Sequence, residues 1–99
     1  MPVYGFRSIK QITDEIKTDF GFPRSLNFKI FNKNSKIMIN QKVRIRVRLQ
    51  PKFTADMPRR VKSFCDELSN RLGVRLDARV EIHYGGHRMH GYRSLASLT

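Results

Sequence analysis

The sequence predicts an α+β domain in which a small antiparallel sheet of three or four strands packs against two helices on one of its faces. Two patterns favour this class: apolar residues recur every three to four positions in two segments, and they alternate with polar residues in the segments between. With 99 residues, 39% of them hydrophobic, the chain is long enough for one domain with its own core. We expect that domain to span residues 1–86 and a flexible basic tail to follow at 87–99.

The first helix is predicted for residues 9–20. Ser8 and Gln11 form a capping box, in which the Ser8 hydroxyl accepts a backbone N–H and the Gln11 side chain reaches back. Gly21 and Pro23 are then expected to end the helix. The apolar stripe of this helix consists of Ile9, Ile12, Ile16 and Phe20.

A hairpin is predicted next. Residues 26–31 alternate between apolar and polar side chains, and residues 32–35 are turn formers. The second strand is expected over residues 36–50, as one strand or two collinear strands, because its apolar residues occupy odd positions. Three arginines then project from the opposite face, namely Arg44, Arg46 and Arg48.

A second helix is predicted for about residues 56–72, with Thr54 or Asp56 as its N-cap and Gly73 as its C-cap. Alternation returns in a long strand over residues 74–84, which Gly85 and Gly86 end. If residues 3–6 add an edge strand, the order is β-α-β-β-α-β, a ferredoxin-like arrangement; without that strand the order is α-β-β-α-β. The buried stripe of the second helix is expected to contain Met57, Val61, Phe64, Cys65, Leu68 and Leu72.

The charge of the chain indicates the class of its partner. Lys and Arg number 20 against 8 Asp and Glu, a formal net charge of +12, and a folded domain with this excess repels itself unless an anion neutralises it. Nucleic acid is the expected partner, and the alternative is an acidic protein surface to which the chain would bind as an adaptor or inhibitor. A membrane is not expected, because no run of 18 apolar residues is present. The single cysteine excludes an intramolecular disulfide and fits a cytoplasmic protein.

The polar face of the predicted sheet is the expected binding surface. If all the long strands share one sheet, six cations face solvent with two acids, Asp77 and Glu81, although cross-strand pairing is the opposing interpretation. Alternate arginines lie roughly 7 Å apart along a strand, which suits successive phosphates. Because Phe31 is the one aromatic expected there, binding should depend on phosphates and have low sequence specificity, with RNA the first candidate. The residues expected to bind nucleic acid are Lys29, Phe31, Arg44, Arg46, Arg48, Arg75, Arg79, His83, Arg88 and Arg93.

His83, His87 and His90 suggest other chemistry. Their spacing suits a metal ion only in a helix or a tight turn, and the two glycines at 85 and 86 disfavour a helix. The same histidines carry groups that a metal-independent ribonuclease needs, but a flexible tail does not hold them in place. We therefore predict no catalytic residue, no metal and no cofactor, and keep the ribonuclease as a less favoured alternative. The cations of the second helix are interpreted as an ordinary solvated surface, and a strand edge beside residues 26–31 or 74–84 as a candidate contact between two copies.

Overall fold

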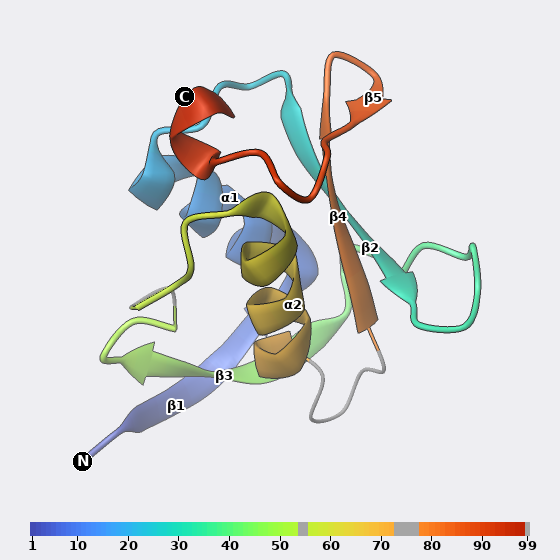
Figure 1. The fold of residues 1–99 in the computed structure, drawn as a ribbon. Coiled ribbons are helices and arrows are strands. Elements are labelled where there is room, and N and C mark those ends of the chain that lie inside the picture. The colour runs from blue at the N-terminus through green and yellow to red at the C-terminus, as the bar shows by residue number, and fades with distance from the viewer. Residues whose placement is uncertain (54–55, 73–77, 99) are drawn as a thin grey trace.

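A computed structural model describes residues 1–53, 56–72 and 78–98 of the chain (Figure 1). The predicted α+β class is confirmed, since helices and antiparallel strands both contribute to one core. In chain order the elements are β1 (Val3–Ser8), α1 (Ile9–Phe20), β2 (Leu26–Asn32), β3 (Arg44–Gln50), α2 (Val61–Leu72), β4 (Ala78–Tyr84), β5 (His87–Arg88) and a 3-10 helix at Leu95–Leu98.

The strands of the described residues form two antiparallel sheets instead of the single sheet that the sequence predicts. β1 pairs with β3 in a two-stranded ribbon, and β2 pairs with β4, which also pairs with β5. Figure 1 shows the β1–β3 ribbon at one end of the molecule, away from β5. The ferredoxin-like order is not confirmed, because β2 and β3, which neighbour each other in that arrangement, lie in separate sheets.

The hairpin predicted over residues 26–50 is much shorter in the structure. A bridge joins Phe31 to Met38, and the Ile39 N–H donates to the Ile30 carbonyl at 2.8 Å. The chain then turns, and the carbonyls of residues 41 and 43 accept the backbone N–H groups of Lys10 and Ile9. The first amides of a helix have no partner within it, so this turn both satisfies α1 and directs β3 into the other sheet. Residues 36–50 are therefore not one strand or two collinear strands.

Helix α1 has the bounds and both ends that the sequence predicts. The Ser8 hydroxyl accepts the Gln11 N–H at 3.1 Å, and the Gln11 side chain accepts the Ser8 N–H at 2.8 Å. Gly21 closes the helix in the left-handed region, with φ of 67°, a conformation that residues with a Cβ seldom adopt. The buried side of the helix carries Ile9, Ile12 and Ile16.

Helix α2 begins at Val61, later than the predicted start near residue 56. The C-terminal segment caps it: the Val61 N–H donates to the Arg93 carbonyl and the Lys62 N–H to the Gly91 carbonyl, both at 2.9 Å. An N-cap side chain at Asp56 is therefore not used, while Thr54 and Gly73 lie outside the described residues.

The segment after residue 87 differs from the predicted flexible tail as far as residue 98, where its description ends. Leu95 and Leu98 are 4% and 3% exposed and belong to the core. The Leu95 N–H donates to the Arg59 carbonyl at 2.8 Å, and the Met89 N–H to the Ile82 carbonyl at 2.8 Å. The segment thus covers the start of α2, as Figure 1 shows.

Strand β4 ends as predicted at a two-glycine turn, where Gly85 and Gly86 have positive φ angles, and its described part begins at Ala78; residues 74–77 lie outside the description. Neither α-helix within the described ranges has the length and apolarity that crossing a membrane requires. The most deeply buried side chains come from both helices and from the β2–β4 sheet: Ile12, Ile16, Leu26, Phe64, Leu68 and Ile82.

Candidate nucleic-acid interface

The outer face of the β1–β3 sheet combines arginines with aromatic side chains, and we call it the arginine ribbon: Tyr4, Phe6, Arg44, Arg46 and Arg48. Along β3 the side chains alternate, and Ile45 and Val47 are 7% and 4% exposed against the core. Arg44 and Arg46 are exposed on the opposite side, and Arg48 is half-buried. The division of β3 into an apolar side and a guanidinium side is thus the one that the sequence predicts.

Strand β1 adds two aromatic side chains to this face. Phe6 lies opposite Arg46 and Tyr4 opposite Arg48 in the antiparallel register. Both rings are about half exposed, at 52% for Phe6 and 50% for Tyr4. The Arg46 guanidinium lies 4.7 Å from the centre of the Tyr4 ring, a cation–π contact that places both side chains on one face. The ribbon therefore offers stacking surfaces as well as positive charge.

No carboxylate of the described residues lies within 4.0 Å of the Arg44, Arg46 or Arg48 guanidinium. Several described acids pair with other cations, as Glu15 does with Arg7 and Asp14 with Lys10. Three like charges on alternate residues repel one another unless an anion lies over them. The electrostatics of the ribbon thus favour an anionic ligand.

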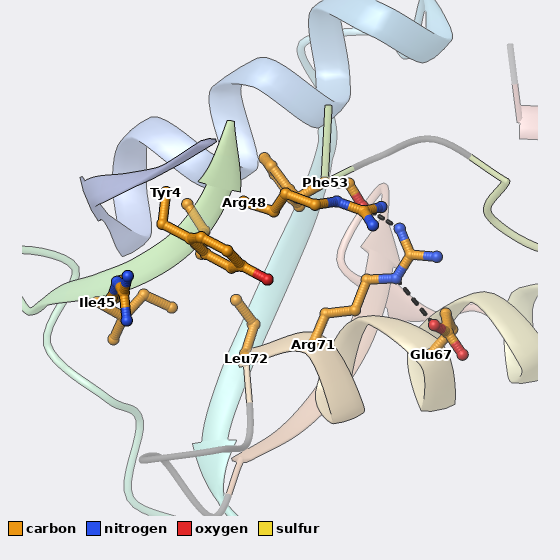
Figure 2. A pocket seen from close by; sticks show the side chains of 9 residues that line it. Tyr4, Ile45, Arg48, Phe53, Glu67, Arg71 and Leu72 are labelled. Carbon is orange, nitrogen blue, oxygen red and sulfur yellow. Dashed lines mark hydrogen bonds and ion pairs between the residues drawn. The ribbon is translucent and has the colours of Figure 1, made fainter. Parts of the chain in front are cut away.

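A pocket of about 480 Å³ lies between β3 and α2, and Tyr4, Arg46 and Arg48 of the ribbon line it. Figure 2 shows the Tyr4 hydroxyl and the Arg48 and Arg71 side chains pointing toward this space. The Arg71 Nε donates to Glu67 Oε1 at 2.8 Å, and a terminal nitrogen of Arg71 donates to the Phe53 carbonyl. These bonds fix the direction of the Arg71 guanidinium.

A second group of predicted residues lies on the other sheet, around Glu81. The Glu81 carboxylate is 3.2 Å from an Arg79 nitrogen, 3.1 Å from His83 Nε2 and 3.9 Å from Arg88 Nε. Burial raises the pKa of Glu81, but the His83 hydrogen bond and the charges of Arg88 and Arg79 outweigh it, so that the net shift is downward. Glu81 thus partly neutralises the cations around it, through Arg79 and His83 on its own strand and through Arg88 across the β4–β5 pair.

The remaining predicted residues are dispersed over the fold. Lys29 is half-buried opposite Glu81, and the Arg79 guanidinium covers the Phe31 ring at 4.9 Å. Arg93 donates to Ser97 Oγ at 2.9 Å within the C-terminal segment, and Arg75 lies outside the described residues. The structure thus brings Arg44, Arg46 and Arg48 together, and separately Arg79, His83 and Arg88, but it does not unite both groups on one sheet.

The histidines and the cysteine, which are the candidate groups for metal binding or catalysis, lie in separate surroundings. His83 contacts Glu81, whereas the His90 ring stacks on Tyr92 with the ring centres 5.1 Å apart. Among the described residues, no three His, Cys, Asp or Glu side chains are close enough to hold a metal ion. Burial, and to a smaller extent Asp66, raises the pKa of Cys65 to about 12, so its thiol is protonated at neutral pH and is a poor nucleophile.

Sequence reasoning missed Tyr4, Phe6 and Arg71. The first two alternate with Gly5 at even positions, a signal for one shared face, but the sequence does not say which strand lies beside them. Arg71 belongs to a helix surface that the sequence predicts to be solvated, and its place in the pocket depends on β3 passing close to α2. The chain matches no protein-family model, no curated protein and no solved structure.

Proposed function

We propose that the chain binds single-stranded nucleic acid, RNA first of all, through the arginine ribbon and with low sequence specificity. The observation that carries this proposal is a narrow two-stranded face on which three arginines, with no carboxylate of the described residues within 4.0 Å, alternate beside two half-exposed aromatic rings. Guanidinium groups roughly 7 Å apart suit the phosphates of an extended strand. Bases stack on aromatic rings with little regard to sequence, because every base has a π face.

The aromatic rings favour nucleic acid over an acidic protein surface. A partner that contributes only carboxylates would use the arginines but would leave Phe6 exposed opposite Arg46. A base can cover Phe6 while the neighbouring phosphates reach the guanidiniums, so one strand uses the whole face. A cytoplasmic location, which agrees with one free and buried cysteine, is part of this proposal.

The test compares two triple variants that lose equal charge. In the first, Arg44, Arg46 and Arg48 are replaced by Ser; in the control, Lys33, Lys36 and Arg59, which are exposed elsewhere, are replaced by Ser. Binding of a labelled single-stranded RNA of about 12 nucleotides is measured by fluorescence anisotropy at about 0.15 M salt. We expect the ribbon variant to bind at least about tenfold more weakly than the control, because charge-assisted hydrogen bonds are lost.

A Phe6→Leu variant tests the stacking surface separately. It keeps an apolar side chain but removes the flat ring, so affinity should fall about tenfold with no change of charge. Circular dichroism checks that each variant is folded. Equal losses in the two triple variants would attribute binding to net charge alone. Absence of binding by the wild-type chain would favour the acidic protein partner instead.

A further inference from the structure

The pocket at the end of the arginine ribbon carries more positive charge than one internal phosphate of a strand neutralises. Among the described residues, its lining contains three guanidiniums, from Arg46, Arg48 and Arg71, and one carboxylate, from Glu67, which together carry a formal charge of +2. A phosphodiester carries a single negative charge, whereas a phosphate monoester carries about 1.5 to 2 negative charges at pH 7. A monoester therefore matches the pocket better than an internal phosphate does.

The walls of the pocket strengthen this preference. Phe53 and Leu72, which are 5% and 2% exposed, give it an apolar lining, and charges attract more strongly where apolar groups exclude water. Arg71 is already oriented by its bonds to Glu67 and to the Phe53 carbonyl, so binding costs it little side-chain freedom. The volume of the pocket, about 480 Å³, lies within the range of small-molecule sites.

The position of the pocket says which part of a strand would reach it. Arg44 lies at one end of β3 and does not line the pocket, whereas Arg46 and Arg48, which are nearer the other end, both line it. A strand that follows β3 from Arg44 thus enters the pocket with its last nucleotide, whose phosphate would lie beside both Arg46 and Arg48. We propose that the pocket binds the terminal phosphate monoester of a single-stranded nucleic acid, an inference that depends on the function proposed above. Arg48 and Arg71 would each donate hydrogen bonds to the phosphate oxygens, and the Tyr4 hydroxyl would donate one more.

The experiment compares three RNAs of one sequence: one with a 5′ phosphate, one with a 3′ phosphate and one with hydroxyl groups at both ends. We expect one of the two phosphorylated RNAs to bind the wild-type chain about tenfold more tightly than the hydroxyl RNA. The position of the phosphate in that RNA, 5′ or 3′, identifies the end of the strand that enters the pocket. The Arg71→Gln variant should lose this preference, so that it binds the phosphorylated RNA and the hydroxyl RNA with affinities within about twofold of each other.

Arg44→Gln is the matched control, because it removes one guanidinium from the far end of the same ribbon. It should weaken binding of all three RNAs alike and keep the preference for a phosphorylated end. If Arg71→Gln unfolds, Arg71→Lys and Arg48→Gln take its place. Lysine at position 71 keeps the charge but lacks the planar fork, and Arg48→Gln removes the other guanidinium that would bind the terminal phosphate. Both variants should therefore also reduce the preference for a phosphorylated end.

The outcomes separate this inference from the proposed function. Equal binding of the three RNAs by the wild-type chain would overturn the inference and leave the function standing, whereas no binding of any RNA would remove both. The inference would also be overturned if a free nucleoside monophosphate competed as strongly as the unlabelled phosphorylated RNA. Such competition would show that the pocket takes a free nucleotide and not the end of a strand.

Discussion

Glu81 is the buried acid among the described residues, and neighbouring cations pair with its carboxylate. The residue is 9% exposed and lies on the polar side of β4, where Arg79 and His83 flank it. A carboxylate removed from water must be paired, and here its partners are side chains of the same sheet. The cations around Glu81 are thus partly neutralised, whereas no carboxylate in the described part of the chain lies within 4.0 Å of Arg44, Arg46 or Arg48.

We expect Glu81→Gln to lower the free energy of unfolding by about 1 to 3 kcal/mol at pH 7, because charge-assisted hydrogen bonds are lost. The folded-state pKa of Glu81 is lowered from its ordinary value of 4.5, so the stabilisation is complete only above that value. It is lost as the pH falls through the lowered folded-state pKa. Urea unfolding of both proteins from neutral to acidic pH should therefore show a difference that disappears in acid.

The control for this prediction is Asp14→Asn, which removes an exposed pair with Lys10 on α1. Such pairs contribute about 0.3 to 0.5 kcal/mol, so this variant should be nearly as stable as the wild type. A Glu81→Gln variant that keeps the full difference from the wild type at acidic pH would contradict ionic stabilisation at Glu81.

The C-terminal segment acts as part of the core. Its 3-10 helix buries Leu95 and Leu98, and its carbonyls at Gly91 and Arg93 accept the first amides of α2. Four residues are too few for a periodicity to be recognised, and the glycines and histidines before them are typical of loops. The packing of this segment is therefore a tertiary property.

Leu98→Ala should destabilise the chain by about 2 to 4 kcal/mol, since it removes buried methyl groups and leaves a cavity. Tyr92→Ala, at a residue that is 77% exposed in the same segment, should change stability by less than about 0.5 kcal/mol. Urea denaturation measures both. Equal and small effects of the two substitutions would show that the segment behaves in solution as the tail that the sequence predicts.

The charge of the whole molecule and the position of its arginines would make separate contributions to the proposed binding of nucleic acid. The formal net charge of +12 attracts any polyanion from a distance, and it is spread over both sheets and both helices. In the proposed complex, contacts on the arginine ribbon would be local and would displace counterions from particular phosphates. The dependence of affinity on salt distinguishes the two contributions.

For single strands, the logarithm of affinity falls with the logarithm of salt with a slope of about −0.7 for each phosphate contact. Loss of the three ribbon arginines should therefore make the slope less steep by about 2. The control variant with Ser at positions 33, 36 and 59 should keep nearly the wild-type slope. Anisotropy titrations between about 0.05 and 0.3 M salt measure this quantity, and identical slopes for the two triple variants would argue against direct contacts by the ribbon.

Local pattern was sufficient to predict α1 with both of its ends, the alternation of β2 and β3, and the turn at Gly85 and Gly86. These features depend on interactions between residues a few positions apart, such as Ser8 with Gln11, and they can be recognised in the chain itself. The apolar and guanidinium sides of β3 belong to the same class, because alternation along one strand defines both.

Which strands pair with each other is decided by the tertiary structure. Alternation shows which side of β3 is buried, but it is equally compatible with β2 or β1 as the neighbouring strand, because backbone hydrogen bonds between strands carry little sequence information. The turn that satisfies the first amides of α1 directs β3 to β1, and only this pairing places Tyr4 and Phe6 beside the arginines. The approach of α2 to β3 likewise turns Arg71 from a surface residue into part of a pocket.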